Sequence, residues 1–149
     1  KADVMDWEYG SHASTYGGNP VACAASLALI RVLEGGILEN VVKMGDYLMG
    51  RLLELKKTYS IIGDIRGKGL MIGVEIVQDR ETEIKAAIER NFIVEEMVKH
   101  GVILIGCGDN VLRFAPPLIV SKDEIDVCIE AFEKVLKSVK VERPQPSYL

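Results

Sequence analysis

The spacing of apolar residues changes twice along this chain, and this change constrains the fold more than any other feature. Apolar residues recur every three or four positions early in the chain and again near its end, as on one face of an α-helix. Between these regions, short segments alternate apolar and polar residues, which is typical of strands with one buried face. The pattern favours an α+β fold of two layers, in which helices cover one side of a small, mostly antiparallel sheet.

Two helices are expected in the early part of the chain. The first should cover residues 20–34, because Asn19 is a good N-cap and Pro20 suits the first helical position. It is apolar almost all round, so we expect it to be buried or to lie at an interface. The second should cover residues 37–59 with Gly45 on its apolar stripe, where close backbone packing would offset the cost of a glycine, roughly 1 kcal/mol relative to alanine.

The middle and the end of the chain predict a sheet and two more helices. A helix over residues 83–100 should separate the second strand from the third, and Asp109-Asn110 suits a tight hairpin between the last two strands. After Pro116-Pro117, a capping box of Ser121 and Glu124 predicts the start of the last helix. The strands are expected over residues 61–66, 70–77, 102–105 and 111–115.

Composition narrows the class of protein. The chain has 149 residues, is 48% hydrophobic and carries a formal charge of -4, which suits one sizeable core and gives no basic excess for a nucleic-acid partner. Glycine, asparagine and charge interrupt the apolar runs, so we expect no membrane span, no signal peptide and a cytoplasmic location. The three cysteines, Cys23, Cys107 and Cys128, lie in apolar segments and are expected to be buried reduced thiols with no metal or disulfide.

The loop before the first helix is one candidate site. Ser11, Ser14 and Thr15 offer hydroxyls, and Gly17-Gly18 let backbone amides approach a ligand beside a helix N-terminus. This combination suits a phosphate. The same residue types also make ordinary loops and helix caps, so the residues alone leave both interpretations open.

The segment "VLRFAPPL" is the second candidate. Alternation puts Leu112 and Phe114 on one face of the sheet and Arg113 on the other. An arginine held on a strand can bind a carboxylate through two parallel hydrogen bonds, although a surface arginine in a salt bridge fits the pattern equally well. The glycines of "RGKGLMIG" do not predict a dinucleotide site, because a strand-like segment follows them where a helix would be needed.

Three segments in order resemble one enzyme family. "SHASTYGGNPVACAAS" resembles the motif of the class III pyridoxal-phosphate (PLP) aminotransferases, which include acetylornithine, ornithine and 4-aminobutyrate aminotransferases. "IRGKGLMIGVE" and "VLRFAPPLIVSKDEID" resemble two further family segments, so the similarity extends to about residue 138. It implies a fold type I enzyme, with residues 1–36 ending the large domain and residues 37–149 forming a connecting helix and the C-terminal small domain.

The resemblance also implies residue roles. Thr15, with Ser14, would bind the phosphate of the PLP held by the other subunit of a homodimer, and Arg113 would bind the substrate carboxylate. The lysine that holds the cofactor lies upstream in the family and Lys1 does not match it, so we expect no catalytic residue in this chain and no turnover by it alone.

The expected reaction is transfer of an amino group from an amino acid or omega-amino acid to a 2-oxo acid. Two alternatives stay open. The parent enzyme could be a PLP-dependent amino-acid racemase of the same family, or the chain could be a non-catalytic folding or assembly module. None of these hypotheses requires a metal ion, a nucleic acid or a membrane.

Overall fold

A computed structural model describes residues 2–140 of the chain. The chain divides into two compact units, Lys1–Gly36 and Ile37–Leu149, and each is described here by itself. Lys1 and residues 141–149 lie outside the described residues, and these include the segment "RPQPSYL", which its composition predicts to be a frayed tail.

The first unit holds a short 3-10 helix, Ala2–Val4, and then, after a loop, helix α1, Pro20–Val32. The side-chain oxygen of Asn19 accepts hydrogen bonds from the amides of Val21 at 2.9 Å and Ala22 at 3.2 Å. Pro20 stands at the first helical position, where its missing amide hydrogen is no loss. The predicted helix start is therefore confirmed.

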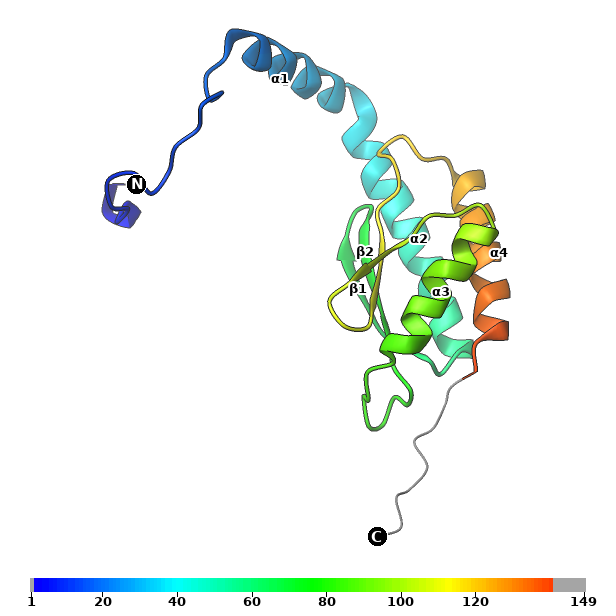
Figure 1. The fold of residues 1–149 in the computed structure, drawn as a ribbon. Helices are drawn as coiled ribbons and strands as arrows, with labels where there is room; N and C mark the ends of the chain where they lie inside the picture. The colour runs from blue at the N-terminus through cyan, green and yellow to red at the C-terminus, as the bar shows by residue number, and fades with distance from the viewer. Residues whose placement is uncertain (1, 141–149) are drawn as a thin grey trace. The chain divides into compact units, whose positions relative to one another are not determined.

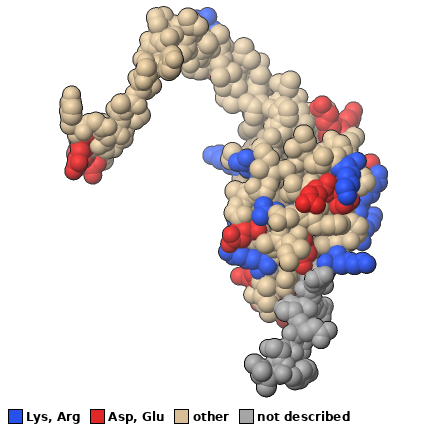
Figure 2. Space-filling view, in the orientation of Figure 1, with Lys and Arg blue, Asp and Glu red and all other residues tan. Residues whose placement is uncertain are grey.

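Helix α1 has no buried residue within this structure. Its surface is almost wholly uncharged (Figure 2), and its apolar side chains are exposed to different degrees, from 48% at Ile30 to 77% at Val21. Of the two outcomes expected for α1, burial is therefore not found within this structure, and a position at an interface stays a prediction.

The helical run that includes α1 passes a composition test for a membrane span. An 18-residue window within Pro20–Thr58 has a mean hydropathy of 1.8. By composition, therefore, this run is apolar enough to cross a membrane, contrary to the expectation from the sequence. However, α1 itself has 13 residues, and helical dihedrals are lost at Gly35 and Gly36. Crossing a bilayer takes about 20 helical residues, so α1 alone is too short to span the membrane.

The second unit contains a four-stranded sheet (Figure 1). Its strands are β1, Ile62–Lys68; β2, Met71–Ile76; β3, Ile105–Cys107; and β4, Val111–Phe114. They lie in the order β1-β2-β4-β3, and every neighbouring pair is antiparallel, as predicted. The segment "RGKGLMIG" forms the β1–β2 hairpin, in which Lys68 pairs with Met71, so a strand does follow its glycines, as predicted.

Three helices cover one face of this sheet: α2, Leu38–Thr58; α3, Ala87–Lys99; and α4, Lys122–Ser138 (Figure 1). The core lies between these helices and the alternate strand residues that face them, among them Ile72, Val74, Leu112 and Phe114. Among residues 37–140, no helix covers the opposite face of the sheet, which is called the open face below. The capping box at the start of α4 is present, with the carboxylate of Glu124 accepting from the amide of Ser121 at 2.8 Å.

Helix α2 meets the β1–β2 turn at a pair of glycines. A β-carbon built on Gly45 would lie 2.5 Å from the carbonyl carbon and oxygen of Gly69. Real β-carbons essentially never approach other atoms so closely. The close backbone packing expected at Gly45 is therefore confirmed, and its partner is a turn distant in sequence.

Two element boundaries differ from the predictions. Strand β3 begins at Ile105, not at residue 102, because the register that pairs Ile105 with Arg113 would place Val102 opposite Pro116, which has no amide hydrogen. Helix α3 begins at Ala87, not at residue 83, because residues 84–86 bond to the end of β2: Gln78 donates to the carbonyl of Ile84 at 2.8 Å.

The three cysteines are free thiols, but two of them are not buried. Cys107 is exposed on the edge strand β3, and Cys23 is exposed on the uncovered α1. Cys128 on α4 is partly buried. The expectation of burial was wrong for Cys23 and Cys107 because it came from apolar neighbours in sequence, which do not determine which neighbours in space cover a side chain.

A polar cluster joins α2 to α4. The hydroxyl of Tyr47 donates to the carboxylate of Asp126 at 2.6 Å, and Arg51 pairs with the same carboxylate. Lys122 lies 3.4 Å from its other oxygen. The pKa of Asp126 is lowered, first by the hydrogen bond from Tyr47. This cluster fixes the relative positions of two helices that carry the core.

Candidate functional site

The loop of residues 11–19 presents donors that suit an anion. Ser14 and Thr15 are exposed, and within residues 2–140 no hydrogen bond forms from their hydroxyls or from the backbone amides of residues 15–18. The side chain of Ser14 lies over Gly17, whose β-carbon position is 3.3 Å from the Ser14 oxygen. Gly18 has a φ of +77°, which glycine adopts without strain. No acidic residue occurs in the loop, so its donors fit a phosphate.

The N-terminus of α1 contributes less than the sequence suggested. The side-chain oxygen of Asn19 already accepts hydrogen bonds from the amides of Val21 and Ala22. The amide of Cys23 donates to the backbone carbonyl of Asn19 at 2.9 Å. The first-turn amides are therefore used within the chain. Any anion bound by this loop would rely on the Ser14 and Thr15 hydroxyls and on the loop amides, with only the helix dipole added.

Arg113 lies on the open face of the sheet, as the alternation predicts. Its strand neighbours Leu112 and Phe114 are buried toward the helices, while Arg113 is half-buried on the other side. It pairs with Gly73 of β2 and with Ile105 of β3, so strands flank it on both sides. A backbone held in this way gives its side chain a defined starting direction.

The guanidinium of Arg113 has no partner among the described residues. Its Nε atom is buried and forms no hydrogen bond, and no carboxylate in residues 2–140 makes an ion pair with it. A buried donor without a partner carries a free-energy cost of about 1–3 kcal/mol, which a ligand can remove. A planar guanidinium binds a carboxylate through two parallel hydrogen bonds, so a carboxylate is the ligand that best suits Arg113.

Three other charged groups on the same face, Asp64, Arg66 and Glu75, are joined by hydrogen bonds. Arg66 on β1 donates to Asp64 and to Glu75, both at 3.0 Å. The pKa of Arg66 is raised, first by its bond to Asp64 and then by that to Glu75, and the pKa of Asp64 is lowered chiefly by Arg66. Asn110 also donates to Glu75, at 3.3 Å. Sequence reasoning missed this network, although the alternation of β1 and β2 already places Arg66 and Glu75 on the same face as Arg113.

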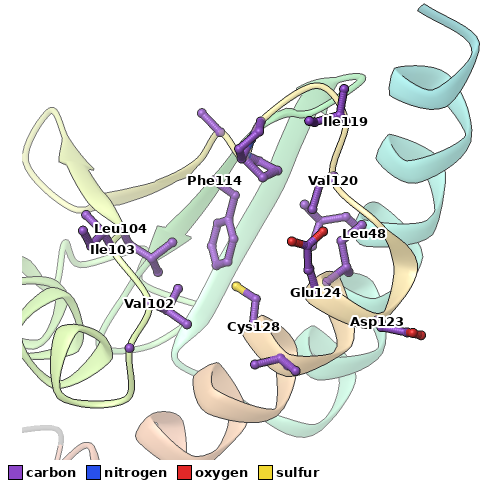
Figure 3. Close-up of a pocket in the computed structure, with 16 residues that line it drawn as sticks. Leu48, Val102, Ile103, Leu104, Phe114, Ile119, Val120, Asp123, Glu124 and Cys128 are labelled. Atoms are coloured by element: carbon purple, nitrogen blue, oxygen red, sulfur yellow. The ribbon is translucent and has the colours of Figure 1, made fainter. Parts of the chain in front are cut away.

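The second unit also has an apolar cavity of about 680 Å³ (Figure 3). It lies between residues 101–104, the segment after β4 and helix α4, with Phe114, Val120 and Cys128 in its wall. The sulfur of Cys128 points into the cavity toward Phe114 (Figure 3), and burial raises its pKa to about 11. Glu124 at its edge is occupied by the capping box. The cavity is therefore mainly apolar, and of the two carboxylates in its lining, Asp123 and Glu124, the second is engaged in the capping box.

The three predicted site residues fall in two places. Ser14 and Thr15 share the loop of the first unit, and Arg113 belongs to the second unit. Within residues 2–140 there is no group of three or more His, Cys, Asp or Glu side chains that could hold a metal ion.

Comparison with known proteins gives a consistent set of relatives. A family model described as Aminotransferase class-III matches residues 1–136. The acetylornithine aminotransferase of Caldanaerobacter subterraneus subsp. tengcongensis is 39% identical over 141 residues, covering 94% of this chain and 34% of that protein. The leucine/methionine racemase of Thermococcus litoralis is 42% identical over 142 residues, covering 94% and 32%.

Solved structures agree with the fold. An aminotransferase from Bacillus anthracis superposes with a TM-score of 0.80 at 32% identity, covering 90% of this chain and 32% of its own. An amine transaminase from an uncultivated Pseudomonas species, solved in a PLP-bound form, gives a TM-score of 0.78 at 32% identity and covers 87% and 30%. The chain therefore spans about a third of the length of the proteins it matches.

Proposed function

The chain belongs to the class-III aminotransferase family, and from this premise we propose that it is the C-terminal part of a PLP-dependent aminotransferase. Its amino donor would be an amino acid or omega-amino acid of the 4-aminobutyrate, ornithine or acetylornithine type, and its acceptor a 2-oxo acid. The observation that carries the proposal is the unpartnered guanidinium of Arg113 on the open face of the sheet. Both substrates would present a carboxylate to it.

The loop of the first unit would hold the cofactor phosphate. Its hydroxyls at Ser14 and Thr15 and its amides at residues 15–18 are the donors without a protein partner in the described chain, and they supply the polar contacts that a phosphate needs. When bound, PLP supplies a ring that accepts the electron pair released at the substrate Cα. The role of this chain would be to bind the phosphate and orient the carboxylate.

We propose that the phosphate held by Thr15 belongs to the cofactor of the other subunit in a homodimer. The exposed apolar helix α1, which follows this loop directly, suits a subunit interface of this kind. The covalent lysine of the family lies upstream of the matching segment, so the chain alone would not turn over amino donors. A cytoplasmic location is part of the same proposal.

Replacement of Arg113 tests the carboxylate site in the full-length enzyme. Arg113→Lys keeps the positive charge but loses the planar fork, so kcat/KM for amino acids should fall strongly while thermal stability stays close to that of the wild type. Amines without a carboxylate should lose far less. An equal loss for both donor classes would contradict the role of Arg113.

A mixed dimer tests whether the site is shared. Thr15→Ala removes one hydrogen bond to a charged group, about 1.5–3 kcal/mol, which corresponds to a loss of cofactor affinity of roughly ten- to over a hundredfold. In a heterodimer of this variant with a subunit lacking the upstream lysine, both lesions fall in one site if Thr15 acts across the interface. The other site is then intact, and heterodimers should be more active than either mutant homodimer. Heterodimers no more active than the homodimers would refute sharing.

A racemase is the second candidate, because the Thermococcus litoralis relative is named a leucine/methionine racemase and is 42% identical to this chain. The two activities separate in one assay. An aminotransferase needs a 2-oxo acid for turnover, whereas a racemase converts an L-amino acid into its D-enantiomer without an acceptor. Chiral chromatography of the full-length enzyme incubated with single L-amino acids would decide between them.

A further inference from the structure

Two arginines face the same side of the sheet with a glycine between them. Arg66 of β1 pairs with Gly73 of β2, and Gly73 pairs with Arg113 of β4. Residues directly opposite each other share a face, so both side chains start on the open face, two strands apart, or about 10 Å. Gly73 has no side chain to separate them.

Glu75 lies on this face as well, because it is two residues from Gly73 along β2 and pairs with Val111. This places it diagonally across from Arg113. Diagonal neighbours lie about 7–8 Å apart between their Cα atoms, which long side chains such as arginine and glutamate bridge readily. Glu75 is thus the acidic residue of β2 that is best placed to pair with Arg113.

Within the described chain, Glu75 does not pair with Arg113. One of its carboxylate oxygens accepts from Arg66 at 3.0 Å and the other from Asn110 at 3.3 Å. Asn110 is itself buried and held by a second bond, to the carbonyl of Ile76 at 2.8 Å. Both oxygens of Glu75 are therefore occupied, one by a donor on β1 and the other by a donor on the hairpin that precedes β4.

We propose that Arg66 is a positioning residue that holds Glu75 away from Arg113 and so keeps the Arg113 guanidinium open for a carboxylate ligand. The inference rests on the proposed function, which assigns that ligand to Arg113. A neighbouring carboxylate tethered to the same sheet competes with a dissolved one at high effective concentration. Arg66 removes this competitor, and Asn110 supports the same position of Glu75.

A simpler role for Arg66 would be to stabilise the sheet through a cross-strand ion pair. The two roles predict different effects when Glu75 is neutralised in a variant that already lacks Arg66. If Arg66 only stabilises the sheet, neutralising Glu75 as well leaves the defect in place. If Arg66 restrains Glu75, removing the Glu75 charge removes the competitor and restores the binding of substrate.

Kinetics of the full-length holoenzyme provide the first test. Arg66→Gln should raise the KM for amino-acid donors about threefold to tenfold, the range expected when one partly exposed ion pair competes with the ligand. The double variant Arg66→Gln/Glu75→Gln should return KM to within about twofold of the wild type. Lys68→Gln, which removes a charge two residues along the same strand face, is the matched control and should leave KM unchanged. A defect that persists in the double variant, or no defect in Arg66→Gln, would overturn the proposal.

A second measurement needs no enzymatic activity, so it separates failure of this inference from failure of the proposed function. Arginine side-chain NMR signals of the chain, assigned with Arg113→Lys, report whether Arg113 gains a carboxylate partner. The Arg113 guanidinium signals should shift in Arg66→Gln and return toward their wild-type position in the double variant. Unchanged Arg113 signals in Arg66→Gln would refute the positioning role, whatever substrate the enzyme uses.

Discussion

The contact between Gly45 and Gly69 makes a quantitative prediction about stability. A β-carbon at Gly45 would lie 2.5 Å from the backbone of Gly69, and backbone atoms cannot move aside by changing a rotamer. Gly45→Ala should therefore carry an overpacking penalty near the upper end of the usual range, about 3 kcal/mol. Alanine is favoured over glycine within a helix by about 1 kcal/mol, so the net loss should be about 2 kcal/mol.

The same helix provides a matched control. Gly50 is exposed on α2, and a β-carbon there would meet nothing within 4 Å. Gly50→Ala should thus gain the helical preference alone, about 1 kcal/mol, and the two variants should differ by about 3 kcal/mol. Urea unfolding followed by circular dichroism would measure the difference, which corresponds to roughly 2 M in midpoint at a slope of about 1.5 kcal/mol per M. If Gly45→Ala were as stable as Gly50→Ala, the proposed close contact would be refuted.

Two further predictions concern Asp126 and Cys128, whose pKa values are shifted in the folded chain. The pKa of Asp126 is lower in the folded chain than its unfolded value of about 4, so its contribution to stability is present above that value and is lost as the pH falls through the folded pKa. Asp126→Asn should lower the urea midpoint at pH 7 and reduce the loss of stability below about pH 4; an unchanged acid profile would contradict this. Because burial raises the pKa of Cys128 to about 11, a thiol reagent at pH 8 should modify Cys107 rapidly and Cys128 slowly. Equally fast modification of Cys107 and Cys128 would contradict the burial of Cys128.

Features that depend on near neighbours in the chain could be predicted from the sequence. The Asn19 cap, the Ser121 capping box and the hairpin at Asp109-Asn110 each use residues a few positions apart, so their chemistry is visible in a short window. The face of Arg113 could also be predicted, because alternation in a strand is a local property and Leu112 and Phe114 mark the buried side. The resemblance of three ordered motifs to one enzyme family adds a prediction for this face, namely that Arg113 binds a carboxylate.

Features that depend on which segments meet required the tertiary structure. Strand β3 starts late because Val102 would face Pro116, and Cys107 is exposed because β3 lies at the sheet edge. The bonds from Arg66 and Asn110 to Glu75 join β1, β2 and the hairpin before β4, and β2 lies beside β4 although β3 comes between them in the chain. The sequence by itself determined the elements and the direction of Arg113, whereas strand pairing decided which charges surround that arginine, because pairing brings together residues that no local pattern relates.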